Sequence, residues 1–138
     1  MIFNSIFDWY KFYEVGCRLY EQGSEEDLRT AINRFYYGSF CYARDYLISN
    51  NIFYDESLKR DLCSGRGIVH ETTRLIFKKE KRLINHNEGK KIHDWLFDLR
   101  NYRNKVDYDP KNDFNLKFMA KQSKIYSKKI FDTINNFK

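Results

Sequence analysis

The sequence is poor in residues that interrupt regular structure and in residues that crosslink a chain or bind metal. Its 138 residues include six glycines, one proline and three cysteines. So little glycine and proline argues against a loop-rich or many-turned β protein. Cys17, Cys41 and Cys63 form no Cys-x-x-Cys pair and fit no zinc spacing. An odd number of cysteines without a secretory leader favours reduced thiols and a cytoplasmic location.

Long apolar segments are also missing. The first residues are apolar, but they lack a basic leader and carry Asp8, so we expect no signal peptide. The longest uncharged runs, such as residues 35–43, are too short to cross a bilayer, so we expect no membrane contact. The histidines have no metal-ligand spacing and no Gly-rich phosphate loop of known form is present. We therefore expect neither a metal ion nor a cofactor.

Positive charge and aromatic rings are abundant. The net charge of +6 and the pI of about 9.2 favour an anionic partner such as nucleic acid, a nucleotide or an acidic protein. Aromatic residues make up 18% of the chain, which is more than one small core needs. We therefore expect an exposed aromatic surface and a homodimer. The length predicts a single domain over residues 1–138.

The first half of the chain predicts two helices. Apolar residues at helical spacing indicate a helix over residues 5–22, which Gly23 ends. Ser24 is the expected N-cap of the next helix, with Asp27 at its third position. This helix, over residues 25–50, is apolar on two sides and is therefore expected at the centre of a bundle, with Cys41 in the core.

The second half predicts three more helices. We expect a single helical turn after Asp55, a helix over residues 68–79, and another over residues 88–106 that Pro110 stops. The last helix starts near Asp113. One of its faces has apolar residues, including Tyr126 and Thr133, and another has Lys117, Lys121, Lys124 and Lys128. The predicted fold is all-α, an antiparallel four- to five-helix bundle.

The candidate site lies in residues 99–110, LRNYRNKVDYDP. On a helix, Arg100, Arg103, Asn104 and Asp107 are three or four residues apart and share one face. Leu99 and Val106 belong to the opposite, buried face. Two guanidinium groups, an amide and a carboxylate together are suited to binding an anion or phosphate. The same pattern also occurs on ordinary solvated helix faces.

Asp107 has two structural interpretations. It pairs with Arg103 one turn earlier, or with Arg34 on the central helix, where an unpaired charge in an apolar helix would be costly. For Tyr108 we expect a packed ring with a hydrogen-bonded hydroxyl.

Three segments carry a family resemblance: residues 31–47 (AINRFYYGSFCYARDYL), residues 67–77 (GIVHETTRLIF) and residues 99–110. In this order they resemble the HEPN superfamily, most closely its small prokaryotic subgroup whose closing motif ends in Asp-Tyr. The resemblance implies a four- or five-helix bundle that is commonly dimeric. Many HEPN proteins are metal-independent ribonucleases, often toxins or phage-defence effectors. Others are inactive partners of a small nucleotidyltransferase, which in some cases modifies a tyrosine corresponding to Tyr108.

The sequence departs from the active members of this superfamily. Their site is an arginine followed, after four to six residues, by a histidine, and neither Arg100 nor Arg103 has a histidine at that distance. RNA cleavage would need another base, for which Asp107, His70 and His93 are the candidates, while arginines and Lys105 would stabilise phosphate charge. The candidate catalytic residues are Arg100, Arg103 and Asp107. The candidate RNA- or nucleotide-binding residues are Arg34, Arg100, Arg103, Asn104, Lys105 and Tyr108.

Three functions remain open. The first is a binding module for RNA, a nucleotide or a partner protein, in a toxin–antitoxin or phage-defence setting. The second is a metal-independent endoribonuclease toxin with a replaced base. The third is a non-catalytic partner of a nucleotidyltransferase, and an antitoxin is a further candidate partner.

Overall fold

The computed structural model describes residues 7–52, 56–63, 67–80, 86–110 and 115–137, and within these ranges it is helical without strands. The helices in chain order are α1 (Tyr10–Gln22), α2 (Glu25–Ser49), α3 (Glu56–Cys63), α4 (Ile68–Lys79), α5 (His86–Tyr108) and α6 (Leu116–Asn135). The predicted all-α class is confirmed. The additional helix is α3, which occupies the place where the sequence predicted a single turn.

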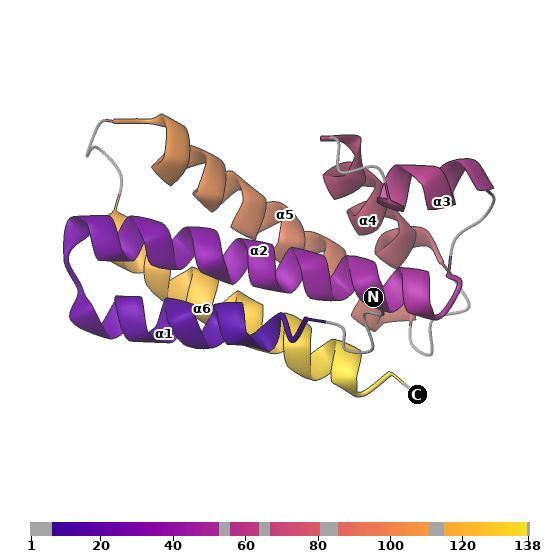
Figure 1. Ribbon diagram of the computed structural model, residues 1–138, viewed down its shortest axis with the longest axis horizontal. Coiled ribbons are helices and arrows are strands. Elements are labelled where there is room, and N and C mark those ends of the chain that lie inside the picture. Colours follow the sequence, from indigo (N-terminus) through magenta and orange to yellow (C-terminus); the bar gives the residue numbers. More distant parts are fainter. Residues whose placement is uncertain (1–6, 53–55, 64–66, 81–85, 111–114, 138) are drawn as a thin grey trace, which may run out of the picture.

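Helix α2 is the central element (Figure 1). It packs against each of the other five helices, because it has apolar residues on two sides. Helices α1 and α6 lie along one side of α2 and α4 lies on the other, while α5 contacts α2, α4 and α6. Cys41 is buried in the core as predicted, and burial raises the pKa of its thiol to about 11, which makes it a poor nucleophile.

The turn between α1 and α2 follows the prediction. Gly23 has a left-handed backbone (φ 77°), and its N–H donates to the Leu19 carbonyl at 3.1 Å. The Ser24 hydroxyl accepts a hydrogen bond from the Asp27 N–H at 3.1 Å and caps α2. The start of α1 differs, because it begins at Tyr10 instead of near Ser5. Asp8 accepts the Tyr10 N–H at 3.1 Å, and residues 5 and 6 lie outside the described residues.

Small residues let α2 approach its neighbours closely. A Cβ added at Gly38 would lie 2.9 Å from the Cβ of Phe12 and 3.1 Å from the carbonyl oxygen of Trp9, so only glycine fits this contact with α1. On the α6 side, the hydroxyls of Ser39 and Ser127 are hydrogen-bonded at 2.7 Å, and both residues are buried.

Helix α5 extends two residues beyond the prediction at each end. Its C-terminal turn is held by Arg29 of α2, whose guanidinium donates to the carbonyls of Val106 at 2.6 Å and Asp109 at 3.1 Å. These two bonds satisfy carbonyl groups that a helix end leaves without an intrahelical partner. The following Pro110 cannot continue the helix.

Helix α6 begins at Leu116, and the side chain of Asn115 caps it by accepting the Phe118 N–H at 3.0 Å. The predicted start at Asp113 lies outside the described residues. The buried residues of α6 are Met119, Ala120, Ser123, Ser127, Ile130, Phe131 and Ile134. Tyr126 and Thr133, which we predicted on this face, are only partly buried, because α6 packs against α1 and α2 as well as α5 and so buries a broader face.

Candidate functional site

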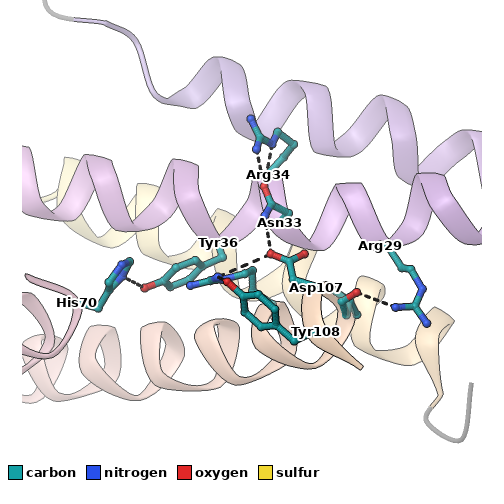
Figure 2. A network of polar contacts seen from close by, with 9 residues as sticks. Arg29, Asn33, Arg34, Tyr36, His70, Asp107 and Tyr108 are labelled. Carbon is teal, nitrogen blue, oxygen red and sulfur yellow. Dashed lines mark hydrogen bonds and ion pairs between the residues drawn. The ribbon is translucent and has the colours of Figure 1, made fainter. Parts of the chain in front are cut away.

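Polar side chains join the C-terminal end of α5 to the middle of α2 (Figure 2). The Asp107 carboxylate accepts a hydrogen bond from the Asn33 amide at 3.0 Å and lies 3.7 Å from the Arg103 guanidinium. The Nε of Arg34 donates to the side-chain oxygen of Asn33 at 3.1 Å. Of the two predicted partners of Asp107, Arg103 is confirmed. The direct Arg34–Asp107 pair is wrong, because Asn33 lies between them.

Arg34 belongs to the contact between α1 and α2. Its guanidinium carbon lies 4.6 Å from the centroid of the Phe12 ring. Figure 2 shows Arg34 on the α1 side of α2, whereas Asp107 and Tyr108 lie on the α5 side. The structure therefore separates Arg34 from the other predicted site residues.

Arg103 is buried among tyrosine rings, although the sequence placed it on an exposed stripe. Its side chain lies 5.1 Å from the ring centroid of Tyr37, 5.5 Å from that of Tyr36 and 5.9 Å from that of Tyr108. Only 6% of the residue is exposed. Its Nη1 also donates to the Tyr108 hydroxyl at 3.4 Å, so the hydroxyl of Tyr108 has the predicted hydrogen bond. Cation–π contact with several rings offsets part of the cost of burying this charge.

His70 of α4 lies in the same region. Its Nδ1 is hydrogen-bonded to the hydroxyl of Tyr36, and its ring stacks on Phe40 with centroids 4.3 Å apart. Burial, followed by the positive charges of Arg100 and Arg103, lowers the pKa of the His70 imidazole to about 4. The imidazole is therefore uncharged at neutral pH.

Two further arginines face this histidine. Arg100 of α5 contributes the largest charge effect on both His70 and Tyr36. Arg74 lies one turn after His70 on α4, and its guanidinium carbon is 5.4 Å from the ring centroid of Phe97 on α5. Burial lowers the pKa of Arg74. We call Arg74, Arg100 and Arg103 the arginine cluster.

The arginine cluster has more hydrogen-bond donors than acceptors. Buried N–H groups without a partner occur at Nε and Nη1 of Arg74, at Nε of Arg100 and at Nε of Arg103. Within the described residues, only Arg103 has a carboxylate at ion-pair distance. A buried donor without an acceptor is costly, and guanidinium groups bind carboxylates and phosphates through paired N–H groups. The cluster is therefore suited to an external anion.

The remaining predicted residues surround the end of α5. Tyr108 is 74% exposed, Lys105 is exposed and Asn104 is half-buried. His93 is hydrogen-bonded through Nδ1 to the neighbouring Asp94 at 2.8 Å. Of the three candidate bases, His70 is therefore the one whose pKa the arginines perturb, Asp107 is paired with Arg103 and His93 is paired with Asp94.

Arg74 and Arg29 were missed in the sequence. A signal for Arg74 was available, because it follows His70 by four residues and so lies on the same face of a short helix whose neighbours Thr73 and Phe77 are apolar or small. No local signal identifies Arg29, whose acceptors, the carbonyls of Val106 and Asp109, lie far along the chain on α5.

No protein-family model, no curated protein and no solved structure matches this chain. None of the helices in the described ranges combines the length and apolar character needed to cross a membrane. In the same ranges, no three His, Cys, Asp or Glu side chains are grouped so that they would hold a metal ion.

Proposed function

We propose that the protein is a HEPN-like helical protein that binds a phosphate group of RNA or of a nucleotide at the arginine cluster. The observation that carries this proposal is the set of unpartnered, buried guanidinium N–H groups on Arg74, Arg100 and Arg103. The family resemblance adds a toxin–antitoxin or phage-defence setting, in which an antitoxin or a nucleotidyltransferase is the protein partner.

The chemistry of the cluster favours phosphate over a carboxylate side chain of the protein. Two helices supply the cationic groups, Arg74 from α4 and Arg100 and Arg103 from α5, so their N–H groups converge from different directions. A phosphate has enough acceptor oxygens to bind several guanidinium groups at once. The neutral His70 and the protonated Tyr36 hydroxyl add hydrogen-bonding groups without adding charge.

The test is equilibrium binding of AMP and of a fluorescein-labelled single-stranded RNA to the wild type, Arg100→Gln and Arg60→Gln. Arg60 is an exposed arginine of α3 and gives the same change in net charge outside the cluster. We expect Arg100→Gln to weaken AMP binding about tenfold or more, because a charge-assisted hydrogen bond is lost, and Arg60→Gln to change it less than about twofold. Equal effects of the two substitutions, or no AMP binding by the wild type, would contradict the proposal.

A second function, metal-independent RNA cleavage, is favoured by the position of His70. The histidine that the HEPN motif lacks on α5 has a counterpart from α4 of the same chain, beside Arg100 and Arg103. With its proton on Nδ1, His70 donates to Tyr36 and keeps a basic Nε2 for the ribose 2′-hydroxyl. Bound phosphate would raise the pKa of His70 and so strengthen it as a base.

Incubation of RNA with the protein in EDTA tests this alternative. If the protein is a ribonuclease, cleavage persists in EDTA and is lost in both His70→Gln and Arg100→Gln. Loss in Arg100→Gln with full activity in His70→Gln would assign the base elsewhere, with Asp107 as the next candidate. Absence of cleavage, with AMP and RNA binding intact, would leave the binding module as the function.

We also propose that the protein forms a homodimer. Phe97 on α5 and Ile68 on α4 are 46% and 48% exposed, and both helices carry arginines of the cluster. A second copy that covers these apolar side chains would also shield the arginine cluster from water. Light scattering gives the test, since a monomer at high concentration would contradict the dimer without affecting the proposed phosphate site.

A further inference from the structure

We propose that the groove between α1 and α6, separate from the arginine cluster, binds single-stranded nucleic acid. The groove has a volume of about 430 Å³. Its lining comprises Tyr13 and Tyr20 of α1 with Lys121, Lys124, Lys128 and Lys129 of α6. We call these residues the lysine groove.

The lysine groove is strongly positive because α6 is. Helix α6 contains five lysines and a single acidic residue, Asp132. Asp132 pairs with Lys128 at 3.0 Å. Lys121 and Lys124 have no carboxylate partner among the described residues, so their charges are available to an external anion. Regularly spaced lysines along a helix attract a linear polyanion better than a single compact one.

Aromatic rings accompany these lysines. The ammonium of Lys124 lies 5.1 Å from the ring centroid of Tyr20, and that of Lys128 lies 5.5 Å from the ring centroid of Tyr10. Tyr20 is only partly buried, and Ile125, which also lines the groove, is 36% exposed. Grooves that bind single strands combine cationic side chains for the backbone with ring faces for unpaired bases. Bases in a duplex cannot stack in this way, so a single strand fits the groove better.

The lysine groove and the arginine cluster are on different parts of the molecule. The described residues of α4, which carry Arg74 and His70, make no contact with those of α1 or α6. Figure 1 shows α2 between α4 on one side and the α1–α6 pair on the other. Binding in the groove therefore does not depend on the proposed phosphate site, and each site can be removed without the other.

The test uses fluorescence anisotropy with a fluorescein-labelled oligouridylate and three proteins. These are the wild type, the double variant Lys121→Gln/Lys124→Gln, and the control Lys78→Gln/Lys79→Gln, which removes the same charge from exposed residues of α4. We expect the groove variant to weaken binding about tenfold and to reduce the salt slope by about 1.4, the value for two lost contacts with a single strand. The control is expected to change binding less than about twofold.

Other arms separate the competing outcomes. Tyr20→Leu keeps an apolar side chain but removes the ring, and we expect it to weaken oligouridylate binding about fivefold or more. AMP binding by the groove variant is expected to equal that of the wild type, which separates this site from the arginine cluster. Equal loss in the groove and control variants would overturn the proposal. Tighter binding to duplex RNA, or to vesicles of phosphatidylserine and phosphatidylcholine with none to the oligonucleotide, would also overturn it.

Discussion

The hydroxyl of Tyr36 and Nδ1 of His70 form a hydrogen bond that joins the central helix α2 to α4. Tyr36 is 1% exposed, so this bond is made within the core. Tyr36→Phe keeps the ring and removes the bond, and we expect it to lower the free energy of unfolding by about 1 kcal/mol. Urea denaturation measures the change. Tyr37→Phe is the matched control, and an equal loss there would show that the bond to His70 contributes nothing.

The stability of the protein is expected to depend on pH through His70. Its folded-state pKa of about 4 lies below the unfolded value, so the fold favours the neutral imidazole. This contribution is complete above the unfolded pKa of about 6.5 and is lost as the pH falls towards 4. We expect the free energy of unfolding to fall by about 1–2 kcal/mol between about pH 7.5 and pH 5. His70→Gln should show a smaller fall, and an unchanged pH dependence would contradict the assignment.

Phosphate binding at the arginine cluster should be visible at His70. An anion close to the imidazole favours the charged form, so AMP is expected to raise the pKa of His70 from about 4 by about one unit. Titration of the imidazole resonances by NMR, with and without AMP, gives the measurement. In Arg100→Gln the effect of AMP should be much smaller. A His70 pKa that AMP leaves unchanged would exclude phosphate from the neighbourhood of the cluster.

Arg29 is expected to hold the last turn of α5 in place. Arg29→Ala removes its hydrogen bonds to the carbonyls of Val106 and Asp109, and we expect a loss of about 1–2 kcal/mol in the free energy of unfolding. Hydrogen exchange gives a local readout, because the Asp109 N–H is bonded to the Lys105 carbonyl at 3.0 Å and should exchange faster. Arg18→Ala, at an exposed site on α1, should leave both quantities unchanged.

Gly38→Ala tests the close contact of α1 with α2. The added Cβ would meet Phe12 and the Trp9 carbonyl, and we expect a loss of about 1–3 kcal/mol in the free energy of unfolding. Gly67→Ala is the control, since a Cβ there meets nothing within 4 Å, and its effect should be within about 0.5 kcal/mol or slightly stabilising. Similar melting temperatures for the two variants would contradict the tight packing at Gly38.

Much of the helical architecture follows from local signals in the sequence. Gly23 and Ser24 identify the turn between α1 and α2 because their backbone and side-chain chemistry act within a few residues. The central place of α2 follows from its two apolar faces. The start of α1 was placed too early because the apolar pattern continues before Asp8, whose carboxylate bonds the Tyr10 N–H at the beginning of the helix.

The candidate site was harder to predict because its geometry depends on contacts between helices. Spacing on α5 correctly grouped Arg103 with Asp107, but it could not show that the tyrosines of α2 would enclose Arg103. It also assigned Arg34 to Asp107, since spacing within one helix does not reveal that Asn33 intervenes. The proximity of His70 to Arg100 arises only when α4 packs on α5.

The single hydrogen atom that serves as the side chain of Gly38 has an effect well beyond its own contact. It determines how far α1 stands from α2, and α1 supplies the tyrosine wall of the lysine groove. A bulkier residue at this position would push that wall outward and widen the groove while every residue lining it stayed the same. A related chain could thus adjust the thickness of the strand it accommodates through one buried substitution that touches no ligand.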